Sequence, residues 1–283
     1  MRDICFIDKT YDSTLSNLYH LSIQISLDGF SFCILDIPKG KYIVLKGFHL
    51  FLKRPRLLLK HLKEFFQSEA MLNQTYKSVE VLYATNQFTI VPQPFYHKSS
   101  SERMLFFGQN IEKGFVGERN QLSQSEAWII YAIPETLREF ILSKYPKVQI
   151  KHNLYPLIEK NLKDNRMSGD GVQLHLNFLR GIFEVVLIKG SKLILCNIFE
   201  YGNERDALYH VLNIFEQLKL VPDAADLIIH GEISQVSPLY HLFRKYIKRT
   251  SFARPNNLYS YSYTFSQLPE HYNTTLFNVY KCE

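Results

Sequence analysis

The sequence predicts an α/β protein of two similar lobes, each with a mixed sheet that begins as a three-strand antiparallel meander and carries helices. Two segments, residues 21–50 and 172–201, support this prediction, because each contains three apolar runs separated by turn residues. After each meander comes an amphipathic helix pattern and then a further short strand. The polar residues 168–171 lie between the halves and mark the best candidate for a domain boundary.

The first meander begins with the alternation that is typical of a half-buried strand. Its apolar residues alternate with polar ones at Leu21, Ile23, Ile25 and Leu27. Asp28 and Gly29 then form a tight turn, because glycine adopts a positive φ without steric cost. Further strands are predicted at 32–37 and 42–45, with a second glycine turn between them.

The second meander resembles a repeat of the first. Placing Leu21 on Val172, an offset of 151 residues, aligns the two segments to their ends without a gap. Five aligned pairs are identical: Phe32 and Phe183, Ile37 and Ile188, Lys41 and Lys192, Ile43 and Ile194, and Phe48 and Phe199. Any two meanders share alternation, so it is these identities that favour an internal duplication.

The remaining elements follow in chain order. In the first half, helices are predicted at 55–66, 134–145 and 154–162, strands at 79–83, 88–91, 104–107, 127–133 and 148–151, and a polar serine-rich loop at 98–102. In the second half, we expect a helix capped by Asn203 and ending near 218, a strand at 227–229, a helix at 238–249 and an alternating tyrosine strand at 259–265. We therefore expect one domain at 1–167, with an insert around 95–125, and a second at 168–283.

Composition indicates an ordinary folded protein. Of the 283 residues 46% are hydrophobic and 21% charged, and the net charge of +6 permits a basic patch without requiring one. Neither the four cysteines nor the histidines have the close spacing of a metal site. Because no signal peptide or long apolar run is found, we expect a reduced, soluble, cytoplasmic protein with no membrane span.

Several phrases of the sequence resemble a known family. They are LSIQISLDGFSFCIL in the first meander, the boundary with the second meander, and Gly231-Glu232-Ile233-Ser234 followed by Ser237-Pro238-Leu239-Tyr240. Through them the chain resembles an uncharacterised bacterial family, domain-of-unknown-function family 3822. That resemblance implies an actin-like ATPase architecture of two ribonuclease H-like lobes over nearly the whole chain.

The superfamily's chemistry implies three features. A first hairpin turn carries an aspartate, a glycine and a hydroxyl residue, which bind phosphates and a hydrated magnesium ion, and a second turn repeats this from the opposite side. A strand that ends in two glycines lies against the adenosine.

This sequence departs from that pattern at all three places. The first turn, SLDGFS, has its acid displaced into the turn at Asp28, beside Gly29. The second, NFLRG, has no carboxylate, and its Arg180, next to Gly181, could meet a phosphate but could not hold magnesium. The third, IIHGE, keeps Gly231 and replaces the second glycine with Glu232.

We therefore expect a catalytically inactive protein without catalytic residues, metal or cofactor, which acts through another protein. One alternative is a nucleotide-binding ATPase or kinase relative that holds ATP and magnesium at a non-standard site. That site would consist of Asp28, Gly29, Arg180, Gly181, Gly231 and Glu232.

A second alternative is a weakly basic nucleic-acid-binding module. Its basic patch would gather on one outer helix face and continue just beyond it, and would consist of Arg244, Lys245, Lys248, Arg249 and Arg254. The more ordinary interpretation of these residues is a solvated helix face opposite a buried stripe.

Overall fold

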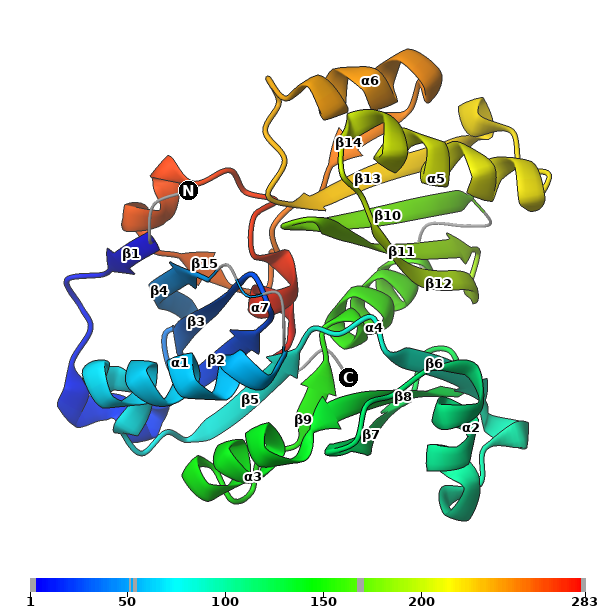
Figure 1. Cartoon of the computed structure of the whole chain (residues 1–283). Coiled ribbons are helices and arrows are strands. Elements are labelled where there is room, and N and C mark those ends of the chain that lie inside the picture. Colours follow the sequence, from blue (N-terminus) through cyan, green and yellow to red (C-terminus); the bar gives the residue numbers. More distant parts are fainter. Residues whose placement is uncertain (1–3, 51, 53–54, 167–170, 281–283) are drawn as a thin grey trace.

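A computed structural model describes residues 4–50, 52, 55–166 and 171–280 of the chain (Figure 1). Over those residues the strands form sheets of seven, five and three strands. The two larger sheets belong to the two meanders, and the small one is inserted into the first half. The predicted α/β class is therefore confirmed.

The seven-stranded sheet is built around the first meander. Its order is β1 (Ile4–Ile7), β4 (Lys41–His49), β3 (Gly29–Asp36), β2 (Tyr19–Ile25), β5 (Ser78–Tyr83) and β9 (Ile150–His152), and β15 (Ser260–Tyr261) also pairs with β4. The strands β2, β3 and β4 are antiparallel, as predicted, and β5 runs parallel to β2.

The five-stranded sheet repeats this arrangement with the second meander. Its order is β12 (Lys192–Glu200), β11 (Ile182–Lys189), β10 (Val172–Leu179), β13 (Ala225–Gly231) and β14 (Thr250–Phe252). Again the meander is antiparallel, and β13 runs parallel to β10.

The match between the sheets extends to local detail. Each meander has a register shift between its last two strands, after Ile34 in β3 and after Leu187 in β11. The aligned residues Phe32 and Phe183 are both fully buried. The two segments are thus equivalent in strand order and strand direction.

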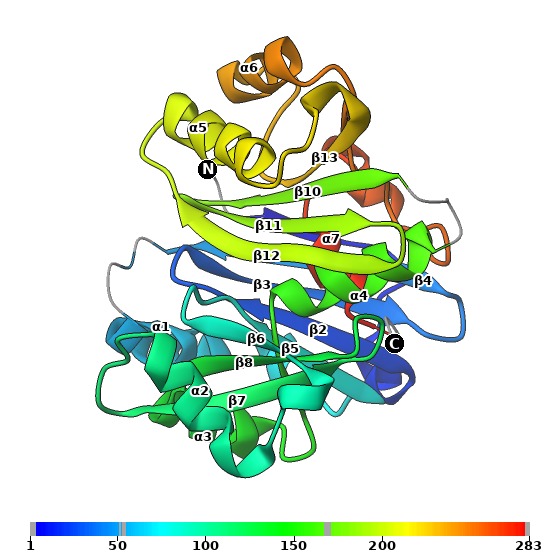
Figure 2. The same cartoon turned by 90° about the vertical axis from the view of Figure 1, so that its right-hand side faces the viewer.

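Helices cover both large sheets (Figures 1 and 2). One face of the first sheet packs against α1 (Pro55–Ser68), and the outer face of the second packs against α5 (Glu204–Gln217) and α6 (Pro238–Tyr246). Between the two sheets lie α4 (Leu154–Asn165) and α7 (Thr274–Asn278), which contact each other as well as strands of both sheets. The predicted cap of α5 is confirmed, since the Asn203 side chain accepts from two backbone N–H groups.

The first half contains a small sheet near the predicted insert, and the bounds of that insert, around 95–125, stay a prediction. This sheet has the order β6 (Phe88–Pro92), β8 (Ala127–Pro134), β7 (Phe115–Leu122), with α2 (Ser101–Gly108) packed on it and α3 (Glu135–Lys144) following β8. The prediction of a strand at 104–107 was wrong, because those residues lie in α2 and bury Leu105 against β8. The strand β7 was not predicted, because charged and polar residues break its apolar pattern.

Two predictions near the C-terminal end were also wrong. The helix predicted at 238–249 ends at Tyr246. The strand predicted at 259–265 is reduced to β15, because Ser262 caps a 3-10 turn, η6 (Tyr263–Gln267). The other 3-10 turns are η1 (Ser13–Leu18), η2 (Ala70–Asn73), η3 (Gln93–Phe95), η4 (Lys98–Ser100) and η5 (Pro222–Ala224).

The domain limits of 1–167 and 168–283 stay a prediction, because residues 167–170 lie outside the described part of the chain. The last described residues, however, return to the first sheet. The pairing of β15 with β4 is one such contact, and Phe265, Leu276 and Phe277 pack against Tyr42 and its neighbours.

Candidate functional site

The turns of the two meanders meet between the lobes. The Asp28 carboxylate, in the turn between β2 and β3, accepts a hydrogen bond of 2.9 Å from the backbone N–H of Arg180, in the turn between β10 and β11. The Ser26 hydroxyl donates to the same carboxylate and lies 3.1 Å from the carbonyl oxygen of Gly29. An acid and an amide of the kind that would otherwise face a metal and a phosphate are therefore bonded to each other.

The equivalent strand ends carry no carboxylate. The offset of 151 residues places Ser26 opposite Asn177, at the ends of β2 and β10. The Asn177 amide donates 2.7 Å to Glu184 on the neighbouring strand β11. A hydroxyl and an amide that already have partners stand where the resemblance implies a metal-binding acid.

A glycine is required at position 231 because the chain's own backbone comes very close to it. Its φ is +79°, and a Cβ built there would lie 2.1 Å from the carbonyl oxygen of Phe178. Around it, the N–H of Gly231 donates 2.9 Å to His271 and the N–H of Glu232 donates 3.1 Å to Phe178. The close approach that glycine permits is thus taken up by β10.

The space among these groups is small. We call it the phosphate cleft and define it by Asp28, Gly29, Asn177, Gly231 and Glu232. A void of about 60 Å³ lies between them. That is far below the roughly 300–1,000 Å³ that is common for ligand sites. A side chain is excluded at Gly29 as it is at Gly231, because a Cβ at Gly29 would lie 2.5 Å from the Phe48 carbonyl oxygen.

Beside the phosphate cleft lies a buried acid that was not predicted. Glu184 is fully buried, and its carboxylate accepts from the side-chain amides of Asn153, at 2.9 Å, and Asn177. Burial raises the pKa of Glu184 to about 7; the two amides lower it, and the Asp28 carboxylate raises it. In the sequence this residue looks like one polar position in an apolar strand, so only the fold reveals its setting.

Glu184 lies on a polar path between the parts of the molecule. Asn153 stands at the start of α4, and its backbone N–H donates 3.0 Å to Tyr83 at the end of β5. Its neighbour His152 binds the Asn120 side chain of β7 through the backbone N–H, at 2.8 Å. The second lobe is therefore connected through Asn153 to both the first sheet and the small sheet.

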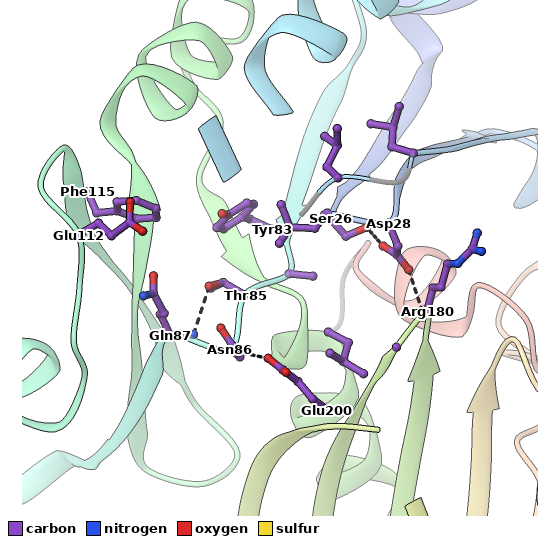
Figure 3. Close-up of a pocket in the computed structure, with 16 residues that line it drawn as sticks. Ser26, Asp28, Tyr83, Thr85, Asn86, Gln87, Glu112, Phe115, Arg180 and Glu200 are labelled. Atoms are coloured by element: carbon purple, nitrogen blue, oxygen red, sulfur yellow. Dashed lines mark hydrogen bonds between the residues drawn. The ribbon is translucent and has the colours of Figure 1, made fainter. Parts of the chain in front are cut away.

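A larger cavity of about 700 Å³ opens on the other side of the turns (Figure 3). We call it the interlobe cavity. It is lined by residues 26–28, 83–87 and 180–182 together with Leu50, Leu52, Glu112, Phe115 and Glu200. Three bodies therefore contribute to it: the first sheet, the small sheet and the second lobe.

The six residues of the predicted nucleotide site line two spaces that meet at Asp28. Gly29, Gly231 and Glu232 line the phosphate cleft, Arg180 and Gly181 line the interlobe cavity, and Asp28 borders both. Nucleotide binding by these six residues stays a prediction.

The predicted basic patch does not lie on one helix face. Because α6 ends at Tyr246, Lys248 and Arg249 fall beyond it, and they pair with Asp223 at 2.6 Å and Asp226 at 3.2 Å. Arg254 is exposed beyond β14. Nucleic-acid binding through these residues stays a prediction, although two of the cations face acids.

Two further features are absent from the described residues. Within them, no group of three or more His, Cys, Asp or Glu side chains could hold a metal ion. Nor does that part of the chain contain a helix long and apolar enough to cross a membrane.

Comparison with known proteins supports the fold. A family model described as "Protein of unknown function (DUF3822)" matches residues 8–250. A Bacteroides thetaiotaomicron protein "with actin-like ATPase fold and unknown function" is 24% identical, with a TM-score of 0.77 over 86% of this chain and 94% of that one. A chain of a "PilM-PilN type IV pilus biogenesis complex" is 14% identical, with a TM-score of 0.54 over 92% and 97%. No curated protein matches the sequence.

The fold implies magnesium and ATP, and the residues of the phosphate cleft do not fit them. A magnesium ion in a protein is usually held by one or two carboxylates, and in this cleft the Asp28 carboxylate already accepts hydrogen bonds from the Ser26 hydroxyl and the N–H of Arg180. A nucleotide phosphate needs turn N–H groups, and that of Arg180 is bonded to Asp28. The space beside Gly231 is filled by the Phe178 carbonyl.

Proposed function

Because the chain belongs to the DUF3822 family of unknown function and has an actin-like ATPase fold, we propose that it is a catalytically inactive relative that acts by binding a protein partner. The observation that carries the proposal is the hydrogen bond between Asp28 and the N–H of Arg180. It joins the two turns that would otherwise cradle a nucleotide.

The rest of the phosphate cleft supports an inactive role. Its void is only about 60 Å³, and the chain's own backbone narrows it at Phe178, Gly231 and Glu232. A nucleotide would have to break these contacts before it could enter, and breaking them costs free energy.

A binding role is supported by the interlobe cavity, whose volume of about 700 Å³ far exceeds the void of about 60 Å³ in the phosphate cleft. One protein of similar fold is described as part of a PilM–PilN complex, so this architecture can take part in a protein–protein complex. For this chain, a protein partner is a proposal.

The test is isothermal titration with ATP and magnesium, together with an assay for phosphate release. We expect no binding at micromolar nucleotide and no turnover, for the wild type and for Asp28→Ala alike. Micromolar binding or any turnover would overturn the proposal. Gly231→Glu is not a useful variant, because any side chain there would meet the Phe178 carbonyl even without a nucleotide.

The nucleotide-binding alternative keeps one favourable observation, which is that the interlobe cavity borders Asp28 and Gly181. If a nucleotide binds there, filling the cavity by Ile182→Trp should remove binding, while Ile194→Trp on the half-exposed strand β12 should not. Equal affinity in both variants would exclude this site.

The nucleic-acid alternative has its own signature. Affinity for RNA or DNA should fall steeply with salt and with reversal of Arg244 and Lys248. A flat salt response would remove this alternative.

A further inference from the structure

We propose that the interlobe cavity receives a segment of a partner protein in which a lysine or arginine side chain is flanked by aliphatic residues. The proposal rests on the proposed function and adds the chemistry of the partner. The cavity's size, the charge of its walls and its polar groups carry the argument.

The cavity has the size and lining of a ligand site. Its volume of about 700 Å³ lies within the range of roughly 300–1,000 Å³ that is common for such sites. Aliphatic side chains from separate elements form much of the wall, among them Leu27, Leu50, Leu52 and Ile182. A segment with aliphatic side chains would remove this surface from water.

Acids outnumber bases among the described residues that line the cavity. Asp28, Glu112 and Glu200 each belong to a different body, whereas Arg180 is the single cationic side chain of this set. In Figure 3 the Arg180 guanidinium points away from Asn86 and Glu200. The interior therefore presents carboxylates from several directions, an arrangement that favours a cation.

The loop after β5 offers groups that suit a peptide main chain. Asn86 and Gln87 carry both a donor and an acceptor on each side chain, as does each peptide unit of a bound segment. The Asn86 amide already lies 3.4 Å from the Glu200 carboxylate, so this loop and β12 meet across the cavity. A segment lying here would contact both lobes at once.

An anionic segment fits the same cavity poorly. Its charge would face three carboxylates, and the backbone N–H of Arg180 is already bonded to Asp28. Like charges brought together in a partly enclosed site disfavour binding. The sign of the preferred charge is therefore a specific prediction.

The experiment uses a displayed library of random eight-residue peptides, selected on the full chain. We expect the selected peptides to be enriched in Lys or Arg next to aliphatic residues. A synthetic peptide from the selection should then lose affinity about tenfold or more when its Lys or Arg is replaced by Glu, and similarly on the Glu200→Gln protein. A matched control is Glu216→Gln, which removes an exposed acid of α5 and should leave affinity unchanged.

A second pair of variants tests the location. Ile182→Trp should fill the cavity and abolish binding, and Ile194→Trp should not; thermal unfolding checks that both fold. Selected peptides without cationic enrichment, or ones that bind Ile182→Trp as well as the wild type, would overturn the proposal, as would a library that yields no binder. If a free diamine binds as tightly as the peptide, the ligand is a small cation and not a partner segment, and this result would also overturn the proposal.

The outcomes also separate this inference from the proposed function. Nucleotide binding in the titration above would contradict the inactive role whatever the peptides do. Peptides that bind elsewhere would contradict only the cavity assignment.

Discussion

The Asp28 carboxylate and the backbone N–H of Arg180 form a hydrogen bond of 2.9 Å between two turns that are 152 residues apart in the chain. These turns are equivalent in position, because each joins the first two strands of a meander. In this chain they bind each other across the lobes, and the contact closes one side of the phosphate cleft.

We predict that Asp28→Ala weakens this junction. Such a hydrogen bond contributes about 0.5–1.5 kcal/mol, so hydrogen exchange at the Arg180 amide should be faster by up to about tenfold. Asp28→Asn should lie between, because one amide oxygen replaces the two carboxylate oxygens that now serve Ser26 and Arg180. Glu216→Ala on α5 is the control, and unchanged exchange at Arg180 in Asp28→Ala would contradict the contact.

We predict that Gly231 is required by the fold itself. Gly231→Ala places its Cβ 2.1 Å from the Phe178 carbonyl, so the backbone must move, and we expect a loss of about 3 kcal/mol or more of unfolding free energy. Gly181→Ala is the matched variant, because Gly181 also has a positive φ, of +74°, but no neighbour within 4 Å. Strain alone should cost it about 1–2 kcal/mol. Equal losses in urea unfolding would show that the approach to Phe178 is unimportant.

We predict that the buried Glu184 carboxyl makes the folded protein more stable in mild acid than at neutral pH. Its folded pKa of about 7 lies above the ordinary value of 4.5, so its contribution is complete below about pH 4.5 and is lost as pH rises to about 7. The difference corresponds to roughly 3 kcal/mol as an upper figure. The buried His20, His152 and His175 act oppositely, because burial lowers their pKa and stability falls as the pH drops below about 6.5.

The variant Glu184→Gln separates the pH dependence caused by Glu184 from that caused by the buried histidines. Unfolding free energies of wild type and variant, measured from pH 5 to pH 8, should differ by an amount that changes in favour of the variant as pH rises. Glu216→Gln should follow the wild type throughout. A constant difference between wild type and Glu184→Gln would show that this carboxyl does not titrate in that range.

Much of the fold could be predicted because the meanders and their turns are local patterns. Of the five identical pairs, Phe32 and Phe183 are buried alike in the two sheets, whereas Ile43 is fully buried and Ile194 is 44% exposed. The alternating residues 259–265 predicted a strand that forms only in part, because other interactions determine the backbone there. Tyr261 stacks on Tyr42 with ring centroids 5.5 Å apart, and the Ser262 cap then turns the chain out of the strand.

The site could be predicted less well, because its groups meet only through the fold. Asp28 and Arg180 were identified from their turns, but their bond depends on how the lobes pack. Glu184 was missed because a single acid in an apolar strand carries no motif, and its two amides come from other strands and helices. The small sheet, which completes the interlobe cavity, was missed in part because β7 lacks an apolar stripe.

The most direct test of the account is hydrogen–deuterium exchange of the Arg180, Gly231 and Glu232 amides, with and without ATP and magnesium. These amides already donate to Asp28, His271 and Phe178, so the account predicts slow exchange that the nucleotide does not change. Slower exchange at these positions when ATP and magnesium are added, or fast exchange without them, would contradict a phosphate cleft closed by the chain itself.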